Sequence, residues 1–229
     1  MQLFYHPAST TCRPIMLFAA DHGLAIDYVE VDLWTGAHQR PDFASLNPNK
    51  AVPVLVDGDF ILTECSAILK YLADLVDSAA YPRDLRQRAR VNAAMDWFNT
   101  NFCHEFGHAF VYPQVLPNHA LADSAANELL VAFGRAHAEE RFAVLDRQIR
   151  ANGGDYLLGR DISLADYLGA AYCVLGELVG FDFAPWPNVA RWLRTMREGR
   201  HWDEVHAAFY GWRSATRAEM VPELIAIPA

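Results

Sequence analysis

The pattern of apolar and polar positions divides the chain into two parts of different character. The first part contains four short apolar runs typical of strands, at residues 3–5, 28–31, 52–56 and 60–62. Helical spacing of apolar positions begins near Pro14, after the first run, and near Glu64, after the fourth. Strands that alternate with helices in this way predict an α/β domain.

After residue 84 the apolar positions follow helical spacing almost throughout. Four helices are predicted, over residues 85–111, 120–150, 163–179 and 188–198. Ser163 and Asp166 have the spacing of a capping box at the start of the third. Between the two parts, residues 77–84 carry a proline and break the periodicity. We therefore expect one domain at 1–76, a linker at 77–84 and an all-helical domain at 85–229.

The segment from Val52 to Glu64 is the most informative. Pro53 cannot donate to a sheet, so it should stand where the strand begins, and we expect a cis bond before it. Asp57 and Gly58 predict a hairpin turn, and Thr63 is the expected N-cap of the following helix. A free backbone edge beside a helix start suits the binding of an extended peptide by strand addition.

These motifs, in this order, resemble the glutathione S-transferases over nearly the whole chain. The first loop adds Ser9-Thr10-Thr11-Cys12-Arg13, which matches the Ser-x-x-Cys-Arg pattern of the theta-like and bacterial serine-type members. The resemblance implies a thioredoxin-like α/β domain that binds glutathione, followed by an all-α domain that contributes the electrophile pocket. It implies an enzyme that stabilises the glutathione thiolate and directs it at a small apolar electrophile, by conjugation, dehalogenation or peroxide reduction.

Ser9 is the leading catalytic candidate. A thiol with a pKa near 8.5 is mostly protonated at neutral pH, and only its thiolate attacks electrophiles. A hydroxyl that donates to the sulfur favours the charged form, and the helix start at Pro14 adds a favourable dipole. Cys12 is the runner-up, because some transferase classes use a loop cysteine for thiol–disulfide exchange.

Glutathione has two carboxylates, an amine and a peptide backbone, so its site needs polar groups at both ends and an amide edge between them. By resemblance, His38 holds the glycine carboxylate, Val52 pairs with the cysteinyl unit and Glu64 holds the amine. Family members often have lysine where this chain has Ala51, and serine where it has Cys65. The expected binding residues are His38, Lys50, Val52, Pro53, Glu64, Cys65 and Ser66.

The helix at 85–111 carries a phenylalanine at every fourth position from Phe98. Such a stripe is usually core, but this helix walls the electrophile pocket in the resembling family. We therefore expect Phe102, Phe106 and Phe110 to line that pocket. The same helix contains His104-Glu105-Phe106-Gly107-His108, a match to the zinc-peptidase motif H-E-x-x-H. Its metzincin extension is missing, and we expect no metal, although a zinc peptidase remains the alternative enzyme.

Composition narrows the partners and the compartment. A net charge of −9, from 19 basic and 28 acidic residues, disfavours non-specific nucleic-acid binding. The sequence shows no membrane span. Four scattered cysteines suit a reducing, cytoplasmic location. The resemblance implies a homodimer, with Tyr81, Trp97 and Phe98 near its seam. A non-enzymatic module that binds glutathione or a partner is the alternative outside the enzymes.

Overall fold

The computed structural model describes residues 1–220, with side chains up to Thr216. Residues 221–229 of the expected helical domain lie outside the described residues. Within the described part, no helix is long and apolar enough to cross a membrane.

The first part of the chain forms a four-stranded mixed sheet. Its strands are β1 (Gln2–Tyr5), β2 (Asp27–Glu30), β3 (Val54–Asp57) and β4 (Phe60–Thr63). They lie in the order β2-β1-β3-β4, with β1 parallel to β2 and the other two pairs antiparallel. The predicted thioredoxin-like α/β domain is confirmed.

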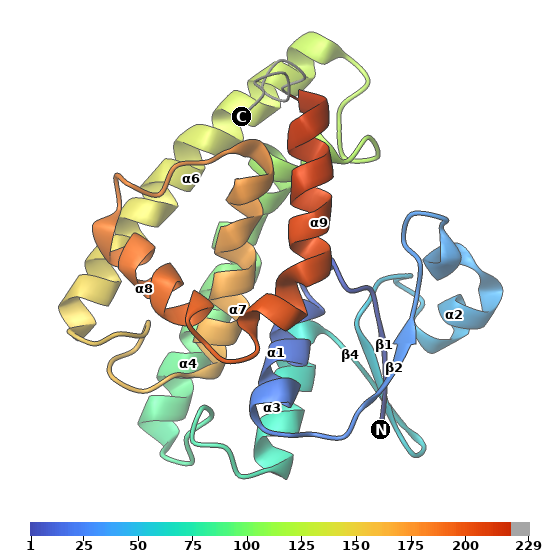
Figure 1. Cartoon of the computed structure of the whole chain (residues 1–229), viewed down its shortest axis with the longest axis vertical. Helices are drawn as coiled ribbons and strands as arrows, with labels where there is room; N and C mark the ends of the chain where they lie inside the picture. Colours follow the sequence, from blue (N-terminus) through green and yellow to red (C-terminus); the bar gives the residue numbers. More distant parts are fainter. Residues whose placement is uncertain (221–229) are drawn as a thin grey trace, which may run out of the picture.

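Helices cover both faces of this sheet. α1 (Arg13–Asp21) and α3 (Cys65–Leu75) lie between the sheet and the helical domain, while α2 (Pro41–Leu46) lies on the far side (Figure 1). Alternate strand residues supply the two faces, because successive side chains of a strand point in opposite directions. Leu3 packs in the core with α1 and α3, whereas Val54 packs with Phe43 of α2.

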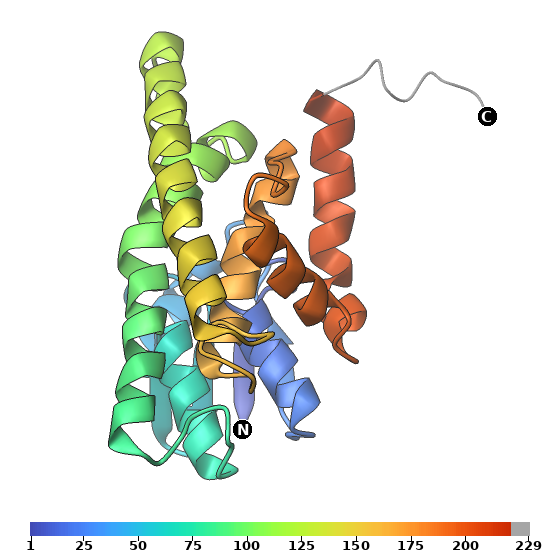
Figure 2. The ribbon, with the colours of Figure 1, turned by 90° about the vertical axis from the view of Figure 1, so that its left-hand side faces the viewer.

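The second part is helical, as predicted. Its elements are α4 (Leu85–Trp97), the π-helix η2 (Phe98–Val111), α5 (Tyr112–Val115), α6 (Ser124–Asn152), α7 (Leu164–Cys173), the 3₁₀-helix η3 (Val174–Val179), α8 (Pro187–Arg197) and α9 (Trp202–Met220). α6 runs beside η2 (Figure 2). Gly134 allows their close contact, since a Cβ there would lie 2.5 Å from the Ala109 carbonyl carbon.

The aromatic residues expected at a dimer seam contribute to the core instead. Tyr81 and Phe98 are buried, with 8% and 1% of their surfaces exposed, and Trp97 is partly buried. Phe98 fills the space above Gly169 of α7, where a Cβ would lie 2.5 Å from its ring. The expectation that Tyr81 and Phe98 serve a partner is wrong because both are used in the core, whereas that for the partly exposed Trp97 stays a prediction.

Candidate active site

The loop between β1 and α1 presents Ser9 to a cavity of about 520 Å³, here called the thiol cavity. The Ser9 amide donates to the His6 carbonyl (3.0 Å), and the Arg13 amide donates to the Ser9 carbonyl (3.1 Å). Ser9 Oγ lies 3.2 Å from Thr11 Oγ1, and Thr11 gives its one hydroxyl proton to the Val52 carbonyl (3.1 Å). The Ser9 proton is therefore the one shared with Thr11, and a rotation of the hydroxyl redirects it to a ligand.

Cys12, the runner-up, lies in a different environment. Its side chain has no exposed surface. Burial raises the pKa of the Cys12 thiol to about 11, although a hydrogen bond with the Ser9 side chain acts in the opposite direction. A reactive cysteine needs an accessible thiol with a lowered pKa. These surroundings favour Ser9 over Cys12 as the group that acts on a bound sulfur.

Two of the expected glutathione-binding residues line the thiol cavity opposite the loop. His38, from the 3₁₀-helix η1 (Ala37–Gln39), and Lys50 both border it. The Nδ1 atom of His38 is buried and makes no hydrogen bond within the described chain. Both side chains can supply N–H donors, so this end of the cavity suits a carboxylate.

Val52 and Pro53 follow, joined by a cis peptide bond as predicted. Sheet pairing of β3 begins at Val54, so the Val52 amide lies outside the ladder and has no hydrogen bond to the described residues. Its carbonyl accepts from Thr11 and keeps a second lone pair. An extended peptide can therefore pair with Val52 through both backbone groups.

A second cavity of about 400 Å³, here called the γ-glutamyl cavity, adjoins the first and shares Val52 with it. Glu64, Cys65 and Ser66 line it together with Pro53. α3 begins at Cys65, and its N-cap is Glu64 at a φ of 70°. Thr63, the predicted N-cap, instead ends β4, because the chain turns into the helix one residue later than the sequence suggested.

The start of α3 supplies backbone donors to this cavity. The Cys65 amide belongs to the first helical turn, whose N–H groups have no partner within the helix. Burial raises the pKa of the Cys65 thiol well above its usual value, so the thiol stays neutral. Cys65 therefore offers its backbone amide, and not its thiol, as a donor to this cavity.

Ser66 is oriented by the helical domain. Its Oγ accepts a hydrogen bond from Asn99 Nδ2 (2.7 Å), and the Tyr172 hydroxyl donates to Asn99 Oδ1 (3.1 Å). Because the Ser66 oxygen is the acceptor, its proton is left to donate to a ligand. The two cavities thus place polar groups at both ends of a free backbone edge, with Ser9 beside its centre.

Comparisons with known proteins identify the family. Residues 1–74 match the glutathione S-transferase N-terminal domain. Over 205 residues the chain is 32% identical to "Glutathione S-transferase 2" of Anopheles gambiae, covering 86% of this chain and 90% of that protein. The chain belongs to the glutathione S-transferase family.

Solved structures of transferases agree in fold over nearly the whole chain. A delta-class glutathione transferase of Nilaparvata lugens superposes with a TM-score of 0.81 at 28% identity, covering 95% of this chain and 98% of that one. Human glutathione S-transferase T1-1 gives 0.80 at 27% identity, with 98% of each chain covered. The predicted family and fold are confirmed, and this chain is an enzyme of the glutathione transferase type.

The phenylalanine stripe of η2 does not line the electrophile pocket, as the sequence had led us to expect, but lies in the core. Phe102, Phe106 and Phe110 have 0%, 0% and 5% exposed surface and line neither the thiol cavity nor the γ-glutamyl cavity. The stripe faces α6, where Phe142 packs edge-on against Phe102 and Phe106 at 5.1 and 5.0 Å between ring centroids. The expectation that these residues line the electrophile pocket is wrong because the most apolar stripe of η2 packs in the core.

The neighbouring stripe of η2 faces the cavities instead. Cys103 and His108 line the γ-glutamyl cavity, and Tyr112 lines both cavities. The Tyr112 hydroxyl donates to Thr10 Oγ1 (3.0 Å), which ties α5 to the loop that carries Ser9. The mixed histidine and tyrosine pattern beside the phenylalanines was the sequence signal for this wall.

The H-E-x-x-H match lies on this helix, but its glutamate has another partner. Glu105 accepts two hydrogen bonds from the Arg141 guanidinium, at 2.5 and 2.9 Å, and Arg141 holds the pKa of Glu105 below its usual value. Among the described residues, no group of three potential ligands has the geometry to hold a metal ion.

Arg13 links the loop that carries Ser9 to the helical domain. The side chain is fully buried at the start of α1, and Nη2 lies 3.4 Å from the Ala171 carbonyl of α7. The guanidinium carbon lies 4.0 Å above the centre of the Phe209 ring of α9. Burial lowers the pKa of Arg13 to about 10, so the group keeps its charge at neutral pH.

Proposed function

We propose that this transferase binds glutathione along the Val52 edge and directs its thiolate, stabilised by Ser9, at a carbon of a small uncharged electrophile. The observation that carries the proposal is the position of the Ser9 hydroxyl in the thiol cavity beside the free Val52 amide. A peptide paired with Val52 through its cysteinyl unit brings its sulfur to this hydroxyl.

The two ends of the tripeptide have complementary partners. His38 and Lys50 supply donors to the glycine carboxylate. Glu64 offers a carboxylate to the γ-glutamyl amine, while the Cys65 amide and the Ser66 hydroxyl donate to the γ-glutamyl carboxylate. The three subsites follow the order of glutathione's own groups, which supports a single bound orientation.

The reaction then balances without a further protein group. The thiol releases its proton to water, and Ser9 donates a hydrogen bond to the sulfur that remains charged. The sulfur electron pair forms the new S–C bond, and the bond to a leaving group such as halide breaks with its pair. The buried, protonated Cys12 gives no support to thiol–disulfide exchange, so we propose carbon conjugation as the main chemistry.

Retention on immobilised glutathione, followed by a panel of halogenated electrophiles, tests this function. The wild-type protein should be retained and should release halide in proportion to conjugate. Glu64→Gln should weaken glutathione binding by roughly ten- to a hundredfold, because a hydrogen bond to a charged group contributes about 1.5–3 kcal/mol. Asp59→Asn, the same change at an exposed hairpin position, is the matched control. A wild-type protein that neither binds glutathione nor forms conjugate would rule the proposal out.

We also propose a cytoplasmic homodimer. All four cysteines are unpaired, which suits a reducing compartment. Both parts of the chain expose apolar residues suited to a partner: Phe60 and Ile61 on the edge strand β4 are each 45% exposed, and Leu129 and Phe133 on α6 are 73% and 54% exposed.

The mass in solution tests the dimer. Sedimentation at micromolar concentration should give about twice the 25.7 kDa of one chain. Phe60→Glu, which places a charge on the exposed strand edge, should shift the equilibrium toward the monomer because an unpaired charge at an interface is costly to bury. A wild-type mass near that of a single chain would contradict the proposal.

A further inference from the structure

A third cavity lies next to the thiol cavity, between α5, the loop after it and α9. Its volume is about 430 Å³, and we call it the outer cavity. It shares four lining residues with the thiol cavity: Trp34, Leu116, Pro117 and Trp212. These four residues therefore form the boundary between the thiol cavity, where the proposed function places the reacting sulfur, and the outer cavity.

The chemistry of the outer cavity is apolar. Among the described residues that line it, up to Thr216, none carries a charge, and the polar side chains are Gln114, Thr216 and the two indoles. Gln114 Nε2 donates to the Phe110 carbonyl at the end of η2 (2.6 Å), so one of its two N–H groups is already used. The cavity suits an uncharged apolar group.

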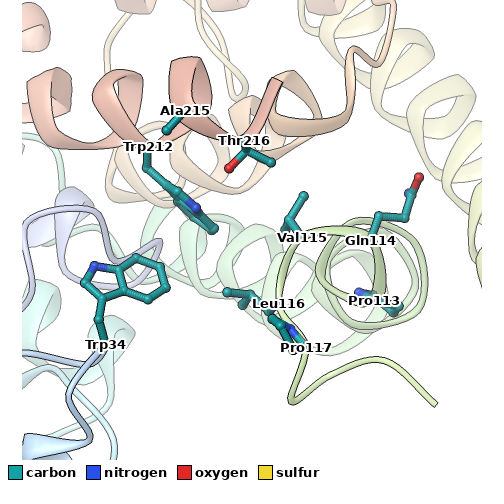
Figure 3. Close-up of a pocket in the computed structure, with 9 residues that line it drawn as sticks. All are labelled: Trp34, Pro113, Gln114, Val115, Leu116, Pro117, Trp212, Ala215 and Thr216. Carbon is teal, nitrogen blue, oxygen red and sulfur yellow. The ribbon is translucent and has the colours of Figure 1, made fainter. Parts of the chain in front are cut away.

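Two tryptophans close the boundary. Trp34, from the loop after β2, and Trp212, from α9, lie on the same side of the outer cavity (Figure 3). Their ring centroids are 5.4 Å apart, with an angle of 60° between the planes. A flat ring inserted between two parallel rings needs about 7 Å between them, twice the contact distance between carbons. The pair as it stands leaves no such gap.

The side chains of Trp34 and Trp212 differ in how closely they are packed. Trp212 packs against the fully buried Phe209, with 6.4 Å between centroids. Trp34 is 59% exposed, and apart from Trp212 its ring packs edge-on against His6, with 5.5 Å between centroids. Its backbone is fixed because the Asp32 carboxylate accepts from the amides of Trp34 (2.9 Å) and Thr35 (3.3 Å). Trp34 can therefore leave the boundary by rotating its side chain, without any movement of the loop.

We infer that Trp34, closed on Trp212, is a specificity-determining barrier that limits how far an electrophile extends from the sulfur. This inference rests on the proposed function. With the barrier closed, the electrophile is confined to the thiol cavity beside Ser9. With Trp34 turned away, an uncharged apolar tail, such as a second aromatic ring, enters the outer cavity.

S-substituted glutathiones of increasing length measure this barrier without requiring turnover. Titration calorimetry should compare glutathione, S-methylglutathione, S-benzylglutathione and S-(4-phenylbenzyl)glutathione on the wild-type protein and on Trp34→Ala. The substitution should improve affinity for the two-ring conjugate at least tenfold relative to its effect on the one-ring conjugate. Because Trp34 also lines the thiol cavity, the changes in affinity for glutathione and S-methylglutathione serve as the baseline against which the change for the two-ring conjugate is measured.

Two further variants separate the barrier from a general effect of removing an aromatic residue. Trp34→Phe should give an intermediate gain, because a smaller ring closes less of the boundary. Tyr28→Ala removes an aromatic side chain of β2 that is 43% exposed and lines neither cavity, and should leave the ratio between the conjugates unchanged.

An equal effect of Trp34→Ala on both conjugates, or a larger loss for the longer one, would overturn the inference and make Trp34 a stacking surface. A wild-type protein that binds neither glutathione nor S-methylglutathione would instead contradict the proposed function. The two failures are therefore distinguishable in one set of titrations.

Discussion

Ser9→Ala should lower kcat at neutral pH by roughly ten- to a thousandfold, equivalent to about 1.4–4 kcal/mol in the barrier. In the proposed mechanism the hydroxyl stabilises the charged form of the bound thiol, so its removal should raise the pKa of that thiol. Glutathione affinity should stay nearly intact, because His38, Val52 and Glu64 still hold the tripeptide.

The pH dependence of kcat should show the direction of the change in the thiol pKa. Activity requires the thiolate, so the variant should recover rate as the pH rises toward the new pKa of the thiol, and the ratio of wild-type to variant rates should shrink. Steady-state kinetics between pH 6 and 9, with the ultraviolet absorbance of the thiolate in the binary complex, measures both quantities. An unchanged thiol pKa in Ser9→Ala would contradict the assigned role.

Cys12→Ala is the matched control in the same loop. It should cost stability through a small cavity in the core and leave the pH profile where it was. An inactive Cys12 variant beside an active Ser9 variant would move this transferase to the cysteine-type members, and the expected chemistry to thiol–disulfide exchange.

Asp166→Ala should lower the free energy of unfolding by about 3–5 kcal/mol, the largest stability effect we expect from one substitution. The carboxylate is fully buried at the start of α7 and accepts four hydrogen bonds. The donors are the Leu157 amide (2.8 Å), the Ser163 amide (2.8 Å), the Ser163 hydroxyl (2.7 Å) and the Trp192 indole (2.9 Å). Truncation leaves all four unsatisfied in the interior.

Urea unfolding followed by circular dichroism measures this effect. Ser163→Ala should cost less, about 1–2 kcal/mol, because it removes the hydroxyl and keeps the carboxylate with its backbone donors. Asp161→Ala, at an exposed position two residues before the cap, should stay within about 0.5 kcal/mol of the wild type. A loss for Asp166→Ala no larger than that for Asp161→Ala would contradict the interpretation.

Features set by neighbours in sequence were predictable. The capping box of Ser163 and Asp166 involves residues three apart, and the structure confirms it. The strand that follows Pro53 and the hairpin after it were likewise predicted from local turn chemistry, although pairing starts only at Val54. The polar groups near Val52 and Glu64 lie in the same stretch, which is why their proximity could be expected.

Features that depend on packing between distant parts of the chain could not be predicted from the sequence. η1 and α2 were missed because they are short and are interrupted at Arg40, so no helical period develops. The phenylalanine stripe fixes a face of η2 but not what that face meets, and α6 lies a long way along the sequence. Trp34 is a single exposed aromatic residue in a loop, and only α9 folding back beside it gives it a neighbour.

The burial of Arg13 has a consequence for modularity. Its charge enters the interior from the catalytic loop, and its contacts there, the Ala171 carbonyl and the Phe209 ring, both belong to the other domain. A chimaera that joins this thioredoxin-like unit to the helical unit of a relative would have to reproduce the contacts of Arg13 with a carbonyl and an aromatic ring. Otherwise the buried guanidinium would lack these contacts, four residues after Ser9. Which helical domains can be combined with this thioredoxin-like unit therefore depends on buried positions of α7 and α9, and not only on the residues that line the cavities.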